Sequence, residues 1–72
     1  MKYLIVIEET NTGFSAYTPD FDGCVAAGKT KKEVEKLMKE AIEFHLEGLE
    51  LEMLSKPIPH TYSSYIEVAA WY

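Results

Sequence analysis

The sequence predicts an α+β fold: a small, mostly antiparallel sheet with one helix packed across it, in the order β-β-β-α-β. Two observations carry this prediction. Short segments rich in β-branched and aromatic residues alternate with turn residues over the first 28 positions. A capped, amphipathic segment then follows at helical period, and the chain closes on a proline-rich link and another apolar run.

The first three strands are expected within residues 3–28. Residues Tyr3–Glu8 form an apolar, β-branched run typical of a strand covered on both faces. Asn11-Thr12-Gly13 is a turn signal that would close a hairpin onto Phe14–Thr18. The segment 19–23 (Pro-Asp-Phe-Asp-Gly) cannot continue a ladder, because proline lacks an amide donor and Asp and Gly favour turns. The third strand is expected over Cys24–Gly28.

The helix is the clearest element of the sequence. Thr30 and Glu33 have the spacing of a capping box, in which the two side chains satisfy free amide donors at the start of a helix. We expect the helix to run from Lys31 to about Leu49 and to cover the sheet with one apolar stripe. The residues of that stripe are Val34, Leu37, Met38, Ala41, Ile42, His45, Leu46 and Leu49.

The C-terminal part should be extended. Pro57 and Pro59 restrict their own φ and disfavour helix at the preceding residue. The run Tyr65–Trp71 is apolar and rich in β-branched and aromatic residues, so it is expected to be the last strand.

Length and charge exclude several functional classes. A chain of 72 residues is expected to form a single domain over 1–72 with a thin core, too small to wall a deep substrate cleft. It has seven lysines, no arginine and a net charge of −5, which argues against direct binding to DNA or RNA. One cysteine and no long apolar stretch favour a cytoplasmic protein without a membrane segment.

No residues are assigned to catalysis, a cofactor or a metal. Asp20 and Asp22 could in principle hold a cation, but turn formation, with side chains bonded to nearby backbone amides, is the favoured interpretation. Cys24 is expected to be a small buried apolar residue, and His45 to be packed against the sheet. We therefore expect no enzymatic activity, including no metal-dependent RNA cleavage.

Binding to a partner protein fits the charge pattern better. Lysines crowd the first half of the predicted helix and acids its second half, opposite to the arrangement that the helix dipole favours. Glu43, Glu47 and Glu50 could steer a basic partner, although a merely solvated face explains them equally well. Tyr65 and Trp71 belong to an aromatic C-terminal group that could anchor a partner or close the core. The last strand could also pair with a second copy. A thin sheet covered on one side leaves apolar area open, so the protein is expected to be a homo-oligomer.

The segment from Ala16 to Glu33, with its Pro-Asp-(apolar)-x-Gly-Cys strand end and its later Gly-x-Thr-x-x-Glu, resembles the signature of the HicB-like antitoxins. The proline-rich link 57–59 also matches, so that the resemblance covers nearly the whole chain. It implies a partial RNase H-like fold and a role as the antitoxin of a type II toxin–antitoxin pair. The implied partner is a small basic HicA-like toxin that cleaves mRNA. The residues that carry the resemblance are Pro19, Asp20, Gly23, Cys24, Gly28, Thr30 and Glu33.

The chain departs from the family in one respect. Many members carry a C-terminal DNA-binding domain, for which we expect no room after the last strand. An alternative to the antitoxin role is an orphan, homo-oligomeric RNA-associated or regulatory module of the same fold without a toxin partner.

Overall fold

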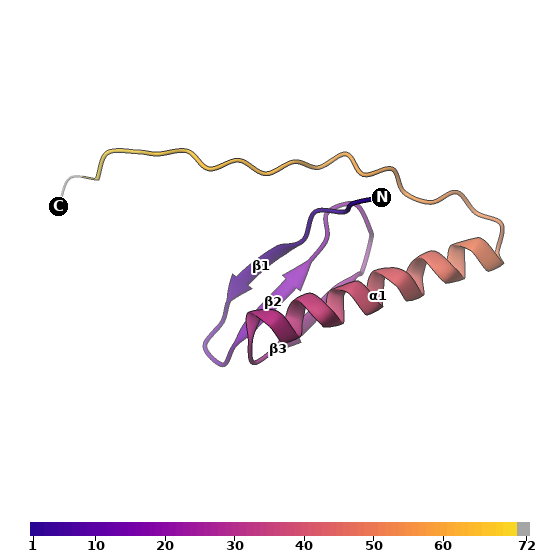
Figure 1. Cartoon of the computed structure of the whole chain (residues 1–72), viewed down its shortest axis with the longest axis horizontal. Helices are drawn as coiled ribbons and strands as arrows, with labels where there is room; N and C mark the ends of the chain where they lie inside the picture. The colour runs from indigo at the N-terminus through magenta and orange to yellow at the C-terminus, as the bar shows by residue number, and fades with distance from the viewer. Residues whose placement is uncertain (71–72) are drawn as a thin grey trace.

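The computed structural model describes residues 1–70, which form a three-stranded sheet followed by one long helix (Figure 1). The strands are β1 (Val6–Glu9), β2 (Phe14–Tyr17) and β3 (Val25–Gly28), and the helix is α1 (Lys31–Leu51). The predicted β-β-β-α order and the antiparallel pairing are confirmed. Strands β1 and β3 begin later than predicted, and α1 continues two residues past Leu49. No helix among the described residues is both long enough and apolar enough to cross a membrane.

The sheet is a meander in the order β1-β2-β3, and its register gives each face a distinct set of side chains. Ile7, Ala16 and Ala26 are opposite one another and pack toward the helix. Because side chains alternate along a strand, the neighbouring row formed by Val6, Tyr17 and Val25 lies on the other face. That face is open: Tyr17 and Val25 are 43% and 67% exposed. In β1 itself, Val6 and Ile7 are half-buried and Glu8 and Glu9 are exposed, so neither face of this strand is fully covered as expected.

The hairpin between β1 and β2 closes where the sequence predicts it. The Thr10 amide donates to the Gly13 carbonyl over 2.8 Å. A side chain at position 13 would collide with the backbone of Gly28 and Lys29. Glycine is needed here because the hairpin loop lies directly against the end of β3.

The capping box at the start of α1 is formed. The Glu33 amide donates to Thr30 Oγ1 over 3.0 Å, and Thr30 has the extended backbone of an N-cap residue. The Glu33 carboxylate accepts from the Lys29 amide at 3.3 Å rather than from the N-cap amide itself. Both side chains thus satisfy backbone donors at the junction of β3 and α1, as predicted.

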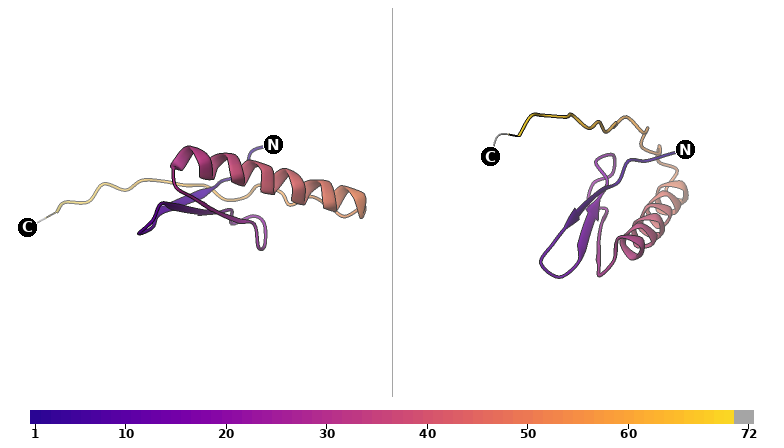
Figure 2. Two further views of the ribbon diagram at one scale, coloured as in Figure 1. Left: turned by 90° about the horizontal axis from the view of Figure 1, so that it is seen from below. Right: turned by 60° about the vertical axis from the view of Figure 1, so that its left-hand side comes forward.

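The helix covers β3 and β2 with one buried stripe, Val34, Met38 and Ile42 (Figure 2). These residues enclose Ala16, Phe21 and Cys24 to form the core. Leu37 was predicted in the same stripe, but it lies at the exposed margin of the helix and is 36% exposed. The C-terminal half of α1 projects past the end of the sheet (Figure 1).

The predicted strand Tyr65–Trp71 is not formed over residues 65–70; Trp71 lies outside the described residues. The segment 55–70 is extended, but it pairs with no strand (Figure 1). Beyond Thr61 its side chains stand in solvent, with Tyr65 and Ile66 101% and 83% exposed. Local propensity gives this run the backbone of a strand, but a strand also needs hydrogen bonds from a neighbour, and the adjacent edge of β1 does not supply them.

Candidate partner-binding site

The loop between β2 and β3 is anchored by Phe21, which is 5% exposed. Its ring meets Tyr3 and His45 edge-on, with centroid distances of 4.6 and 5.1 Å. One aromatic side chain thereby ties the loop to the segment before β1 and to α1. The prediction that His45 packs within the fold is confirmed by this contact.

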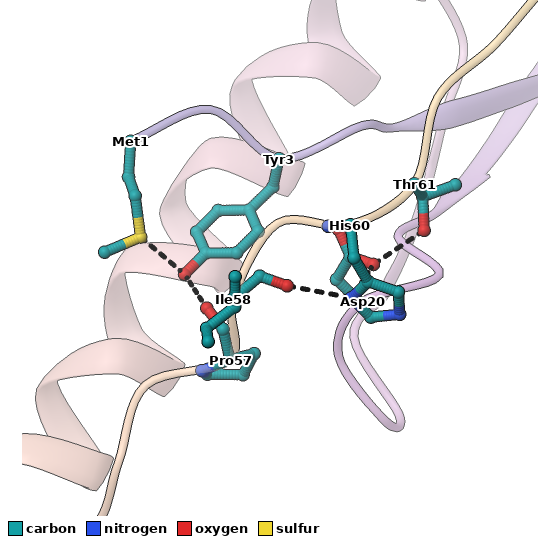
Figure 3. A network of polar contacts seen from close by, with 7 residues as sticks. All are labelled: Met1, Tyr3, Asp20, Pro57, Ile58, His60 and Thr61. Atoms are coloured by element: carbon teal, nitrogen blue, oxygen red, sulfur yellow. Dashed lines mark hydrogen bonds and ion pairs between the residues drawn. The ribbon is translucent and has the colours of Figure 1, made fainter.

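Asp20, in the same loop, binds the C-terminal segment (Figure 3). Its side chain has no exposed surface. Oδ1 accepts a 2.6 Å hydrogen bond from the Thr61 hydroxyl, and Oδ2 accepts from the His60 amide at 3.4 Å. The interpretation of Asp20 as a residue that bonds nearby backbone amides is therefore wrong. It fastens residues 60–61 to the loop, whereas Asp22 is exposed.

The ring of His60 completes this contact. Its Nδ1 lies 3.1 Å from Asp20 Oδ1 and 2.8 Å from the Ile58 carbonyl oxygen. Both neighbours are acceptors, so Nδ1 carries a hydrogen and donates. The ring stays 72% exposed, and the contact is that of a surface side chain folded over a buried carboxylate.

A second contact holds the C-terminal segment at the proline-rich link, residues 57–59. Tyr3 donates its hydroxyl hydrogen to the Pro57 carbonyl over 2.7 Å, and the sulfur of Met1 lies 3.1 Å from the Tyr3 hydroxyl oxygen (Figure 3). Together with Asp20 this contact holds residues 57–61 across the end of the sheet. The sequence did not reveal Tyr3, His60 or Thr61 as partners in this network, because each contact joins residues about 40 to 54 positions apart.

The residues predicted to bind a partner fall into two separate groups. Glu43, Glu47 and Glu50 are exposed and follow one another at helical spacing, so they form one acidic face on the projecting half of α1. The Glu43 carboxylate lies 3.8 Å from Lys39 Nζ, the point at which the basic half of the helix meets the acidic half. Tyr65 lies elsewhere, in the extended C-terminal segment, and is fully exposed.

The remaining candidates do not assemble into a reactive centre. Cys24 is buried, and burial raises the pKa of its thiol, so the thiol stays protonated at neutral pH. The prediction that Cys24 is a buried apolar residue is confirmed. Among residues 1–70, no three His, Cys, Asp or Glu side chains gather as a metal site would require.

Comparison with known proteins decides the family. Residues 3–71 match the family described as the HicB_like antitoxin of bacterial toxin-antitoxin system. This chain belongs to the HicB-like antitoxins. The resemblance inferred from the sequence is thereby confirmed, and it includes the loop that carries Asp20.

Relatives and a solved structure agree with the family match. The chain is 47% identical over 49 residues to an uncharacterized 14.9 kDa protein of Haemophilus phage HP1, covering 68% of this chain but only 37% of the phage protein. It is 42% identical over 50 residues to a UPF0150 protein of Helicobacter pylori, covering 69% of each. The solved HicA3 and HicB3 toxin-antitoxin complex contains a chain with 40% identity and a TM-score of 0.67, matched over 82% of this chain and 70% of that one.

Proposed function

We propose that this HicB-like antitoxin neutralises a small, basic, HicA-like toxin that cleaves mRNA, as one half of a type II pair, and does so by protein–protein contact. The observation that carries the proposal is the match at 40% identity to a chain of the HicA3 and HicB3 toxin-antitoxin complex. The charge of this chain supports it, because an inhibitor with a net charge of −5 and no arginine is electrostatically suited to a basic protein.

Inhibition by contact rather than by chemistry is part of the proposal. Both carboxylate oxygens of Asp20 already accept hydrogen bonds from the C-terminal segment. The thiol of Cys24 is buried and protonated. These observations favour a protein that acts by binding. The net charge of −5 and the absence of arginine support the further proposal that it makes no DNA contacts of its own.

We assign the steering of the toxin to the acidic face of α1, Glu43, Glu47 and Glu50. Exposed charges act mainly on the rate of association, and salt screens them. Reversing all three to lysine should slow association with a HicA-type toxin of the same host about tenfold or more at low salt, measured by stopped-flow or surface plasmon resonance.

The matched control reverses Glu8, Glu9 and Glu67, which are also exposed and give the same change in net charge. Equal rates for both variants would show that overall charge, not this face, steers the toxin. Failure of the unaltered chain to bind the toxin, or to restore growth of cells that express it, would refute the antitoxin role.

A second candidate is self-association through the C-terminal segment, independent of any toxin. It is favoured by the exposure of Tyr62, Tyr65, Ile66 and Val68, between 75% and 101%, on an extended backbone beside an open strand edge. Light scattering should then give a mass of two or more copies for the full chain and of one copy after removal of residues 62–72. A monomer in both cases would exclude this candidate.

A further inference from the structure

A second apolar stripe runs along α1 beside the buried one. It consists of Leu37, Ala41, Phe44, Gly48 and Leu51, which we call the outer seam. The steps between these residues are four, three, four and three, the spacing with which one helix packs along another. Phe44 and Leu51 are 79% and 78% exposed, and Leu37 is 36% exposed.

The fold of the chain explains Ala41, which packs against the core, but it does not explain Phe44 and Leu51. The sheet takes up Val34, Met38 and Ile42, and a helix covered on one side only would carry polar residues at positions 44 and 51. The seam lies largely on the half of α1 that projects past the sheet (Figure 1). Within the part of the chain that the structure describes, the side chains of Phe44 and Leu51 remain open to solvent.

Gly48 gives the seam a shallow hollow. No atom lies within 4 Å of the place where a side chain at position 48 would begin, so nothing inside the chain requires glycine there. Glycine nevertheless weakens the interior of a helix relative to alanine. Phe44, His45, Leu49 and Glu52 surround the hollow, which leaves room for a side chain of another molecule to approach the backbone.

The charges beside the seam specify what can cover it. Glu33, Glu40 and Glu47 recur every seven residues along its solvent side, and all three are exposed. In an antiparallel pair of two copies, the same row would bring Glu40 against Glu47 and create repulsion. A partner with an apolar ridge flanked by Lys or Arg would meet attraction along the whole row instead.

We infer that the outer seam is the docking site for a basic amphipathic helix of the toxin, with its apolar ridge over Phe44 and Leu51 and one side chain seated at Gly48. This inference rests on the proposed function and deepens it, because it names the surface and the form of the bound element. The acidic face next to the seam then speeds association with the toxin, and apolar contacts at the seam slow its dissociation.

The test measures binding of the full chain to a catalytically inactive HicA-type toxin of the same host. The double variant F44A/L51A should bind at least tenfold more weakly, mostly through faster dissociation. Its thermal stability should be unchanged, because both side chains are exposed in the free chain. G48A should also bind more weakly although it stabilises the helix, a combination that a purely structural role would not produce.

The control is V25A/I58A, a pair 67% and 78% exposed in β3 and in the proline-rich link, which should bind as the unaltered chain does. Full-strength binding by F44A/L51A, or equal losses in both pairs, would overturn the inference and leave the antitoxin role intact. Absence of binding by the unaltered chain would overturn both. A toxin-free dimer that F44A/L51A dissociates would show the seam to be an interface between copies, which also overturns the inference.

Discussion

The Asp20 carboxylate accepts a 2.6 Å hydrogen bond from the Thr61 hydroxyl, across 41 positions of the chain. The contact joins the loop that carries the family signature to the segment that follows the proline link. Together with the hydrogen bond from Tyr3 to Pro57, this contact fixes residues 57–61 at the end of the sheet (Figure 3). The position of Thr61 therefore sets where the rest of the C-terminal segment begins. The signature residue Asp20 therefore has a structural role in positioning the C-terminal segment.

Replacing Asp20 with asparagine should destabilise the protein by about 1–3 kcal/mol. Hydrogen bonds to a buried ionised acceptor are stronger than those to a neutral amide, and asparagine offers only one oxygen in place of two. Urea unfolding measures the loss, and hydrogen exchange at the His60 amide should accelerate. Asp22→Asn is the control: Asp22 is exposed, so its substitution should change the free energy of unfolding by less than about 0.5 kcal/mol. Equal effects at the two positions would contradict the contact.

Local signals predicted the fold well, and contacts between distant segments escaped prediction. The capping box of Thr30 and Glu33 and the turn ending at Gly13 depend on neighbours within a few residues, and both are formed. Aspartate is a residue type that turns favour, and no sequence pattern shows that the hydrogen-bond partners of Asp20 are His60 and Thr61. The run from Tyr65 has the propensity of a strand, but pairing depends on another strand, which propensity does not supply.

The candidate site was predicted only in part for the same reason. The acidic face of α1 follows directly from helical spacing, since Glu43, Glu47 and Glu50 are three and four residues apart. The outer seam has equally regular spacing, but Leu37 and Ala41 also belong to the predicted buried stripe. The seam can be distinguished from that stripe only when the residues that contact the sheet are known. Exposure of Phe44 is a property of the packed fold.

Gly13→Ala should destabilise the protein by about 1–3 kcal/mol, because the added methyl group would collide with the backbone of Gly28 and Lys29, which cannot turn aside as a side chain can. Gly48→Ala is the matched control, and its effect on the free energy of unfolding should have the opposite sign. There the space is open, and alanine should stabilise the helix by about 1 kcal/mol. Thermal unfolding of the two variants checks both signs, and a neutral Gly13→Ala would mean that the hairpin does not lie against β3.

Thr18→Val should stabilise the protein by about 1 kcal/mol. Thr18 is 2% exposed, and its hydroxyl has no hydrogen-bond partner among residues 1–70. Valine keeps the shape of the side chain and removes the buried polar group that lacks a partner. Thr61→Val makes the same chemical change where the hydroxyl is used by Asp20, so it should destabilise. Chemical denaturation of both variants tests the contrast; a loss of stability in Thr18→Val would show that its hydroxyl is bonded in solution.

Met53→Gly should stabilise the protein by about 0.5–1 kcal/mol and raise its Tm by several degrees. Helix α1 ends in a paired cap: the Leu54 amide donates to the Leu49 carbonyl at 2.9 Å, and the Met53 amide to the Glu50 carbonyl at 3.1 Å. This cap places Met53 in the left-handed region, at φ 57°, where a side chain is strained.

The gain from this substitution is not offset by lost packing, because Met53 is 93% exposed. Greater freedom of glycine in the unfolded chain limits the gain. Glu52→Gly is the control: Glu52 has φ −89°, an ordinary conformation for any residue, so glycine there should destabilise. Differential scanning calorimetry separates the two changes. A lower Tm for Met53→Gly would mean that α1 does not end in this cap and that the chain leaves the helix along another path toward Asp20.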